Sequence, residues 1–391
     1  YRRQRQMCIR DRGKTSPAFV NYAEGIYVGY KYWETAADEG SINYSDYVQY
    51  PFGYGLSYTT FDQKMGDVTY SGGKVSFDVT VTNTGDKAGK DVVEVYYNPP
   101  YTNGGIEKAS ANLVAFEKTD LLDPGASATV SIKFDDDDMA SYDSKNAKAY
   151  VLEQGDYGIS VRSDSHTTIA EKTITVKDTI TYDSKDNTHN GDAVVATNAF
   201  DDTAGNVTYL SRADKFANYA EATAAPTNYT LPDEYKAKFR NLSNYDPAET
   251  NNDSDKMPTT GAKNGVRLAD LTGKDYDDEL WDKLLDQLTF DQMDKLIAFG
   301  GYGTQAVNSI GKIALTDVDG PASLNNNFTG VGSIGFPSST SVACTWNKDL
   351  ARQFGDGIGD MAHDMHVAGW YAPAMNLSLI HISEPTRPEP I

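Results

Sequence analysis

The hydrophobic residues of this chain change their spacing twice, and each change limits what that stretch can fold into. Over residues 68–178 apolar and polar side chains alternate, most clearly at 75–81, which is the pattern of strands buried on one face. Residues 179–270 show little periodicity, and from about residue 274 apolar residues recur at helical spacing. These changes and a length of 391 residues predict two or three domains.

The alternating stretch predicts a β-sandwich. Alternation resumes over residues 93–97, 128–134 and 157–161, and turn sequences separate the segments, NTGD at 83–86 and DPG at 123–125. Short alternating strands punctuated by such turns are typical of two antiparallel sheets packed face to face.

The next stretch, residues 179–270, predicts an extended connector. It is rich in Asn, Asp, Thr and Ala and contains several prolines. Its apolar residues, which include Leu210 and Phe216, are too many for a free linker. We therefore expect the connector to dock partly on other domains.

The last third of the chain predicts helices alternating with strands. Leu280, Leu284 and Leu288 form one stripe of a helix, and Thr289 with Gln292 forms a capping box that starts the next helix.

Strands are expected over residues 313–318, around 342–344 and from Trp370, and Asn347 is expected to cap a helix between the last two. This order predicts parallel β/α units. A complete (β/α)8 barrel takes about 250 residues, so residues 271–376 can supply only its first part.

Residues 50–61 read YPFGYGLSYTTF, a run too aromatic and glycine-rich for a regular helix or strand. Gly53 and Gly55 permit tight turns, and the aromatic side chains supply apolar area with polar tips. Two interpretations stay open. The run is either a packed crossover loop between two domains or a platform on which sugar rings stack.

Together with EGIYVGY at 24–30, this run resembles the end of the second catalytic domain of glycoside hydrolase family 3, the β-glucosidase family. Further matches to that family are DGP at 319–321, FPS at 336–338, ACTWN at 343–347 and APAMN at 372–376.

The resemblance implies a multidomain, mixed fold. Residues 13–67 would be the tail of an α/β sandwich domain, 68–178 a fibronectin type III-like β-sandwich, 179–270 the connector and 271–376 the N-terminal part of a (β/α)8 barrel. In most members of the family the barrel comes first. The order here therefore resembles the permuted arrangement of a minority, with a chimera of two genes as the rival explanation.

The resemblance also implies a function. The chain would be a fragment of a retaining exo-β-glycosidase, in the first instance a β-glucosidase that needs no cofactor. Its substrates would be oligosaccharides or aryl and alkyl β-glycosides with terminal β-linked glucosyl residues. A β-xylosidase or β-N-acetylglucosaminidase of the same family, or a non-catalytic carbohydrate-binding or adhesion protein, stays open as an alternative.

Asp319 is the candidate substrate-binding residue. Gly320 and Pro321 after it fit a sharp turn, and the C-terminal end of a barrel strand faces the active site. Taken alone, Asp319 could equally cap an element or close a turn. By the resemblance it accepts hydrogen bonds from hydroxyls of the glycosyl unit that is cleaved off. Residues 322–324 depart from the glycine and arginine common after this motif.

No catalytic residue is nominated. Retaining glycosidases use a carboxylate nucleophile and an acid/base about 5–5.5 Å apart. The resemblance places the nucleophile after Asn376 and the acid/base before Gly13. We therefore expect this stretch by itself to be inactive.

The two ends resemble translated sequencing adapters. Residues 1–12 contain RRQRQMCIRDR, and residues 377–391 begin LSLIHISEPTR. A basic nucleic-acid arm or a targeting segment would be the biological interpretation of the first end, but it lacks an apolar region. We expect both ends to be artefacts with no packing role.

The charge of the chain limits its partners. The formal net charge is -21, which argues against nucleic acid or an anionic membrane and favours neutral substrates. No run of the sequence approaches the roughly 18 apolar residues that a membrane span needs.

Three further features predict structure and no site. Cys344 is expected to be a small core residue and not a reactive thiol. The four aspartates at 135–138 lack the spaced ligands of a calcium loop and predict a solvated loop. His363 and His366 predict a surface helix and not a metal site, because no further ligand accompanies them.

Overall fold

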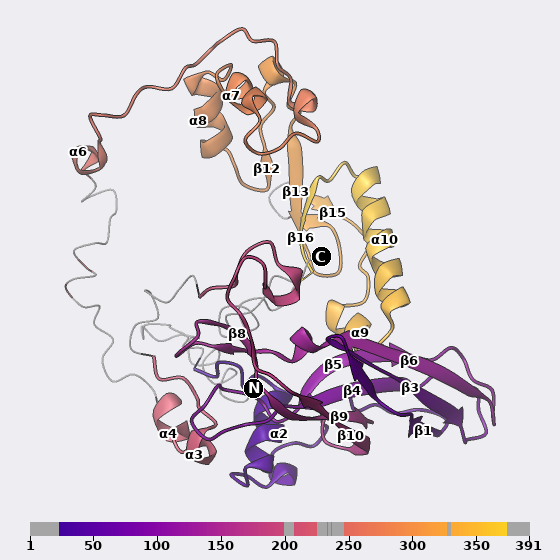
Figure 1. Cartoon of the computed structure of the whole chain (residues 1–391). Coiled ribbons are helices and arrows are strands. Elements are labelled where there is room, and N and C mark those ends of the chain that lie inside the picture. Colours follow the sequence, from indigo (N-terminus) through magenta and orange to yellow (C-terminus); the bar gives the residue numbers. More distant parts are fainter. Residues whose placement is uncertain are drawn as a thin grey trace. The chain divides into compact units, whose positions relative to one another are not determined.

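The computed structural model describes residues 23–198, 207–224, 233, 236, 246–326 and 330–373. The described residues form two compact bodies, one of residues 23–198 and 207–224 and the other of residues 233, 236, 246–326 and 330–373 (Figure 1). The expected adapter segments, 1–12 and 377–391, lie outside the described residues.

The first body is built around two antiparallel sheets. In one sheet, β1 (Phe61–Met65) and β2 (Thr69–Ser71) share one edge of β3 (Lys74–Asn83), and β6 (Ser127–Asp135) lines the other edge. The second sheet has the order β10 (Thr168–Val176), β9 (Gly155–Arg162), β4 (Val92–Asn98), β5 (Asn112–Lys118). A smaller sheet joins β11 (Ile180–Tyr182), β8 (Ala149–Leu152) and β7 (Ser141–Asp143).

The alternation in the sequence becomes the core of this sandwich. In β3 every second side chain is buried, and Phe77 and Val79 lie opposite Ile132 and Val130 of β6. Side chains of β4 and β9 complete the same apolar cluster. Each fully buried side chain of this size contributes roughly 1.5–3 kcal/mol to folding. The predicted β-sandwich is confirmed.

Strand β4 is buried on both faces, because helix α2 (Tyr30–Asp38) packs on the outer face of its sheet. The backbone N–H of Leu113 donates to the Tyr30 hydroxyl at 2.9 Å, and the N–H of Ser110 donates to Thr35 Oγ1 at 2.9 Å. The Tyr30 ring meets Tyr96 of β4 edge-on, with 5.9 Å between the ring centroids. The residues before the sandwich therefore form one folded unit with it.

Part of the connector docks on this body, as expected. Leu210 and Phe216 join Tyr27 and Ala36 in one buried cluster, and Phe216 meets Tyr27 edge-on at 4.9 Å. The short helices of this body are η1 (Tyr44–Asp46), η2 (Asp136–Met139), η3 (His189–Gly191), α3 (Ala213–Phe216) and α4 (Tyr219–Ala222).

The second body alternates helices and short strands. Its helices are α6 (Pro247–Thr250), η4 (Leu268–Leu271), α7 (Glu279–Leu285), α8 (Phe290–Ala298), η5 (Asn308–Ile310), α9 (Ser339–Ala343) and α10 (Lys348–Asp364). Its strands are β12 (Gly303–Thr304), β13 (Leu315–Asp319), β14 (Asn325–Asn326), β15 (Val331–Gly332) and β16 (Gly369–Tyr371).

Strands β13 and β16 are parallel neighbours joined through α9 and α10. Helix α10 runs beside these strands, and its Ile358 packs in one buried cluster with Val318 of β13 and Leu324 (Figure 1). Asn347 caps α10 by accepting a hydrogen bond from the backbone N–H of Leu350 at 3.0 Å. The structure thus contains the parallel β/α unit that the sequence predicts.

The predicted capping box is also present. The N–H of Gln292 donates to Thr289 Oγ1 at 3.2 Å, and the N–H of Thr289 donates to Gln292 Oε1 at 3.0 Å. Helices α7 and α8 pack in a second cluster that includes Leu284, Leu288 and Ile310.

The strand expected around residues 342–344 is wrong. This stretch belongs to helix α9 and its C-terminal cap. Ser338 caps the helix by accepting a hydrogen bond from the N–H of Ser341 at 3.2 Å, which the short apolar run does not reveal. The expectation that Cys344 is a core residue is also wrong, because at the end of α9 its side chain is exposed.

Across the residues that the structure describes, no helix combines the length and the apolar character needed to cross a bilayer.

Candidate functional site

Asp319 lies at the C-terminal end of β13. The preceding residue, Val318, is fully buried against α10. Because successive side chains of a strand point to opposite faces, the Asp319 side chain is partly exposed. In the parallel ladder Asp319 is level with Tyr371, at the C-terminal end of β16. The carboxyl ends of two parallel strands thus meet at one edge, which is where ligands bind in β/α folds.

Gly320 makes the turn that leaves this edge. Its φ is +140°, and a Cβ there would overlap the carbonyl oxygen of Ser323, so only glycine fits. The same Ser323 carbonyl accepts a hydrogen bond from the Trp370 indole N–H at 3.2 Å. The sharp turn predicted after Asp319 is present, and the neighbouring strand holds it in place.

Tyr302 is a residue of this edge that the sequence did not indicate. Its hydroxyl donates a hydrogen bond to Asp319 Oδ2 at 2.7 Å, and this bond raises the pKa of the Tyr302 phenol. The available signal was a tyrosine enclosed by glycines, GGYG at 300–303. Chemically, the edge offers a carboxylate acceptor, a phenol and the ring of Tyr371, which is 85% exposed.

The aromatic run at residues 50–61 has a packed part and an exposed aromatic part. Phe52 stacks on Tyr30 with 4.7 Å between the ring centroids, and its carbonyl accepts a hydrogen bond from the Ser165 N–H at 2.7 Å. Tyr50 and Tyr58 stay largely exposed, at 64% and 98%. The loop is therefore anchored at Phe52, and the rings of Tyr50 and Tyr58 are open to solvent.

Two buried carboxylates lie near this loop, Glu94 beneath Gly53 and Glu34 on α2. Glu94 is 2% exposed, accepts a hydrogen bond from the Tyr96 hydroxyl at 2.7 Å and leaves no room for a side chain at Gly53. Burial raises its pKa to about 8, and the nearby Asp164 adds to the effect.

Glu34 of α2 is the other, at 4% exposure. It accepts hydrogen bonds from the hydroxyls of Tyr44 at 2.6 Å and Ser165 at 2.8 Å, and its other oxygen lies 2.9 Å from His166 Nδ1. The His166 ring stacks on Tyr44 with 3.8 Å between centroids. This network ties α2 to the β9–β10 hairpin and uses both oxygens of the Glu34 carboxylate.

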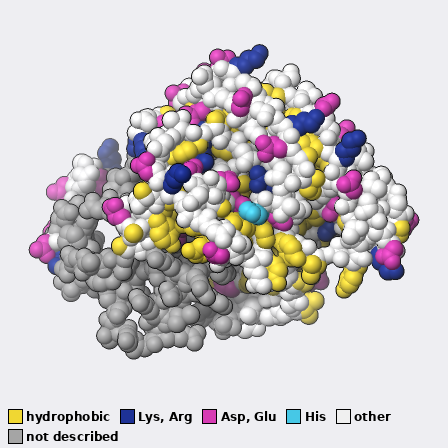
Figure 2. All heavy atoms as spheres, turned by 90° about the horizontal axis from the view of Figure 1, so that it is seen from below, with side chains coloured by type: hydrophobic (Ala, Val, Ile, Leu, Met, Phe, Trp, Pro, Cys, Tyr) yellow, Lys and Arg dark blue, Asp and Glu magenta, His cyan; other side chains and the backbone are white. Residues whose placement is uncertain are grey.

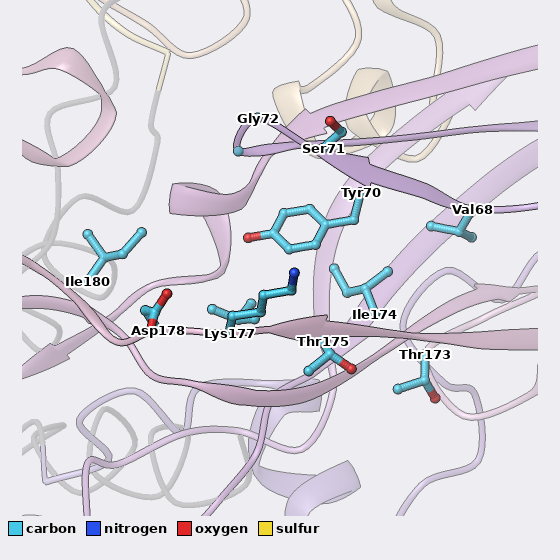
Figure 3. A pocket seen from close by; sticks show the side chains of 12 residues that line it. Val68, Tyr70, Ser71, Gly72, Thr173, Ile174, Thr175, Lys177, Asp178 and Ile180 are labelled. Carbon is cyan, nitrogen blue, oxygen red and sulfur yellow. The ribbon is translucent and has the colours of Figure 1, made fainter.

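A surface groove of about 610 Å³ runs between β2 and the end of β10. Tyr70 and Lys177 point into it from opposite walls (Figure 3). The Tyr70 hydroxyl is already used, because it donates to Asp136 Oδ2 at 2.6 Å. The groove separates the open edges of the two sheets and was not predicted from the sequence.

The aspartates at 135–138 do not form a solvated loop, which corrects the prediction. They form the 3-10 turn η2 with its own capping box, and Asp136 is buried beneath Tyr70. Burial raises the pKa of Asp136. His363 and His366 are exposed, and the described residues contain no group of three or more side chains arranged to hold a metal. On the face drawn in Figure 2, hydrophobic side chains gather in patches between charged side chains of both signs.

The chain is similar to known proteins along most of its length. A model of the fibronectin type III-like domain matches residues 91–165. β-Glucosidase A of Butyrivibrio fibrisolvens is 32% identical over 392 residues, which cover 92% of this chain and 44% of that protein. A β-glucosidase of Ruminococcus albus is 29% identical over 381 residues, which cover 91% of this chain and 35% of that protein. The chain is a relative of the family 3 β-glucosidases.

A solved structure has a similar fold to this chain. The β-glucosidase of Paenibacillus barengoltzii matches it with a TM-score of 0.60 at 23% identity, over 90% of this chain and 37% of that one. This chain therefore spans less than half the length of each of these three β-glucosidases. Its fibronectin type III-like domain contains β4 to β9 of the sandwich.

Proposed function

We propose that the protein containing this chain is a retaining exo-β-glycosidase that hydrolyses terminal β-linked glucosyl residues. The observation that carries the proposal is the similarity to two curated β-glucosidases along about nine-tenths of the chain, and not only in the sandwich. Glycoside substrates follow from the same relatives. The chemistry needs two carboxylates and no cofactor.

The domain boundaries expected from the sequence belong to this proposal. Residues 13–67 would complete an α/β sandwich domain, and residues 271–376 would open a (β/α)8 barrel. The parallel pair β13 and β16 with α9 and α10 between them supports the barrel. The alignment with the Butyrivibrio protein runs through sandwich, connector and barrel start, which supports a permuted gene over a chimera.

Asp319 has the role of hydrogen-bond acceptor for sugar hydroxyls in this proposal. Its position at the carboxyl end of β13, its partial exposure and its tyrosine donor support that role. The nucleophile and the acid/base stay unassigned.

A second specificity also has support. An exo-α-(1→6)-L-arabinopyranosidase of Bifidobacterium breve is 37% identical over 158 residues, 40% of this chain. L-arabinopyranose is a pentopyranose like xylose and unlike glucose. The assay of sugar preference therefore includes glycosides of both pentoses.

The test is an assay of the complete protein on aryl glycosides of β-D-glucose, β-D-xylose, N-acetyl-β-D-glucosamine and α-L-arabinopyranose. We expect the β-glucoside to have the highest kcat/KM and the first product to keep the β configuration in proton NMR. Preference for a pentoside would replace the proposed specificity. Binding of glucosides without hydrolysis of any would favour the non-catalytic carbohydrate-binding protein.

A further inference from the structure

Tyr302 directly precedes β12, which pairs with β13, the strand that ends in Asp319. Gly303 of β12 pairs with Thr316 of β13, and the backbone N–H of Asp317 donates to the Tyr302 carbonyl at 3.0 Å. Tyr302 is thus tied to β13 two residues before the carboxylate that its hydroxyl contacts.

The backbone around Tyr302 is unusual for a tyrosine. Its φ is +49°, in the left-handed region that non-glycine residues rarely occupy. Gly303 cannot be replaced without overlap, because a Cβ there would meet the carbonyl oxygen of Leu315. From this backbone the Tyr302 hydroxyl reaches Asp319 Oδ2 at 2.7 Å. Residues in this region persist only where their surroundings enforce them, and such residues cluster at functional sites.

We propose that Tyr302 is a positioning residue that holds the Asp319 carboxylate for saccharide binding, an inference that rests on the substrate-binding role proposed for Asp319. The phenol donates to one carboxylate oxygen and leaves the other free to accept from sugar hydroxyls. By fixing the side-chain rotamer before the ligand arrives, it removes an ordering cost from binding. The exposed ring of Tyr371 stands level with Asp319 and completes the edge with an aromatic face.

A phenol that served only packing would not depend on the charge of its neighbour. A phenol that acts through Asp319 does, so the two roles separate in a double-mutant cycle. The variants are Tyr302→Phe, which removes only the hydroxyl, Asp319→Asn, and both together in the complete protein. Tyr276→Phe is the matched control, because Tyr276 lies in the same body and is 98% exposed.

We expect Tyr302→Phe to lower kcat/KM on the preferred glycoside by about 3–10-fold with an unchanged thermal midpoint. In the Asp319→Asn background the same change should cost less than about twofold, because the charged acceptor is already gone. Equal losses in both backgrounds, or a Tyr302→Phe protein that behaves like Tyr276→Phe, would overturn the inference.

A second readout tests the contact without any assay of activity. In the whole chain, 13C NMR of labelled tyrosines, with Tyr302 assigned through its Phe variant, follows ionisation of each phenol. Replacing Asp319 by Ala should lower the pKa of Tyr302 towards the ordinary value, because its hydrogen-bond acceptor is lost. An unchanged titration would overturn the contact on which the inference depends.

These results separate the two proposals. If the complete protein hydrolyses glycosides and Asp319→Asn impairs it while Tyr302→Phe does not, only the positioning role fails. If the protein hydrolyses no glycoside, the proposed function fails and the saccharide part of this inference fails with it.

Discussion

The two bodies of this chain hold their carboxylates in opposite ways. In the sandwich, Glu94 and Glu34 are buried, and neighbouring side chains contact Oε2 of Glu94 and both carboxylate oxygens of Glu34. At the end of β13, Asp319 is partly exposed and has a tyrosine donor on one oxygen. A strongly perturbed pKa often marks a functional site. Here it marks Glu94, which is buried directly beneath Gly53. The proposed binding site therefore rests on the accessibility of Asp319 at a strand end and not on a perturbed pKa.

The largest expected effect concerns the pH dependence of Glu94. Its folded pKa of about 8 is above the ordinary 4.5, so the folded state holds this proton more tightly than the unfolded state. The stability that Glu94 contributes is therefore complete below pH 4.5 and is lost as the pH rises through 8. We expect the wild type to lose roughly 3–5 kcal/mol of unfolding free energy over this interval. Glu94→Gln mimics the protonated form and should not show this loss.

Urea unfolding of the whole chain at pH 5 and pH 8.5, followed by circular dichroism, measures this difference between wild type and variant. Glu171→Gln, an exposed change on β10, is the control. Equal pH dependence of wild type and Glu94→Gln would mean that Glu94 is solvated. The two bodies would then not differ in how they hold their carboxylates.

A smaller effect is expected at Glu34. Glu34→Gln keeps the shape but replaces charge-assisted hydrogen bonds by neutral ones, which should destabilise the fold by about 1–2 kcal/mol at neutral pH. The same unfolding experiment measures it. A gain of stability would show that burying the charge costs more free energy than its contacts with hydroxyl and imidazole groups contribute.

The smallest effect on stability is expected at Asp319. Because its side chain is partly exposed and anchored only at one oxygen by Tyr302, Asp319→Ala should change the free energy of unfolding by less than about 1 kcal/mol. A loss as large as that at Glu94 would make Asp319 a structural residue like the sandwich carboxylates.

The sequence predicted elements that depend on local rules. Alternation located β3, β4, β6 and β9, and the Thr289 and Asn347 side chains marked the starts of α8 and α10. It failed at α9, where a short apolar run fits a strand as well as a helix and the deciding contact is the Ser338 cap.

The candidate site was predictable only in part. Asp319 and its glycine turn were evident from their order in the chain. The contact of Tyr302 with Asp319 spans 17 residues and depends on a left-handed tyrosine, which no periodicity reveals. Burial of Asp136 and Glu94 was likewise hidden, because it results from the packing of Tyr70 and Gly53 from elsewhere in the chain.

Saccharide binding by Asp319 is tested by measuring kcat/KM of Asp319→Ala on the preferred β-glycoside in the complete protein. A hydrogen bond from a sugar hydroxyl to a charged acceptor is worth about 1.5–3 kcal/mol, so kcat/KM should fall by about tenfold or more. Asp360→Ala, an exposed change on α10, should leave it unchanged. Near-normal kcat/KM for Asp319→Ala would contradict the account and leave Asp319 as a turn residue.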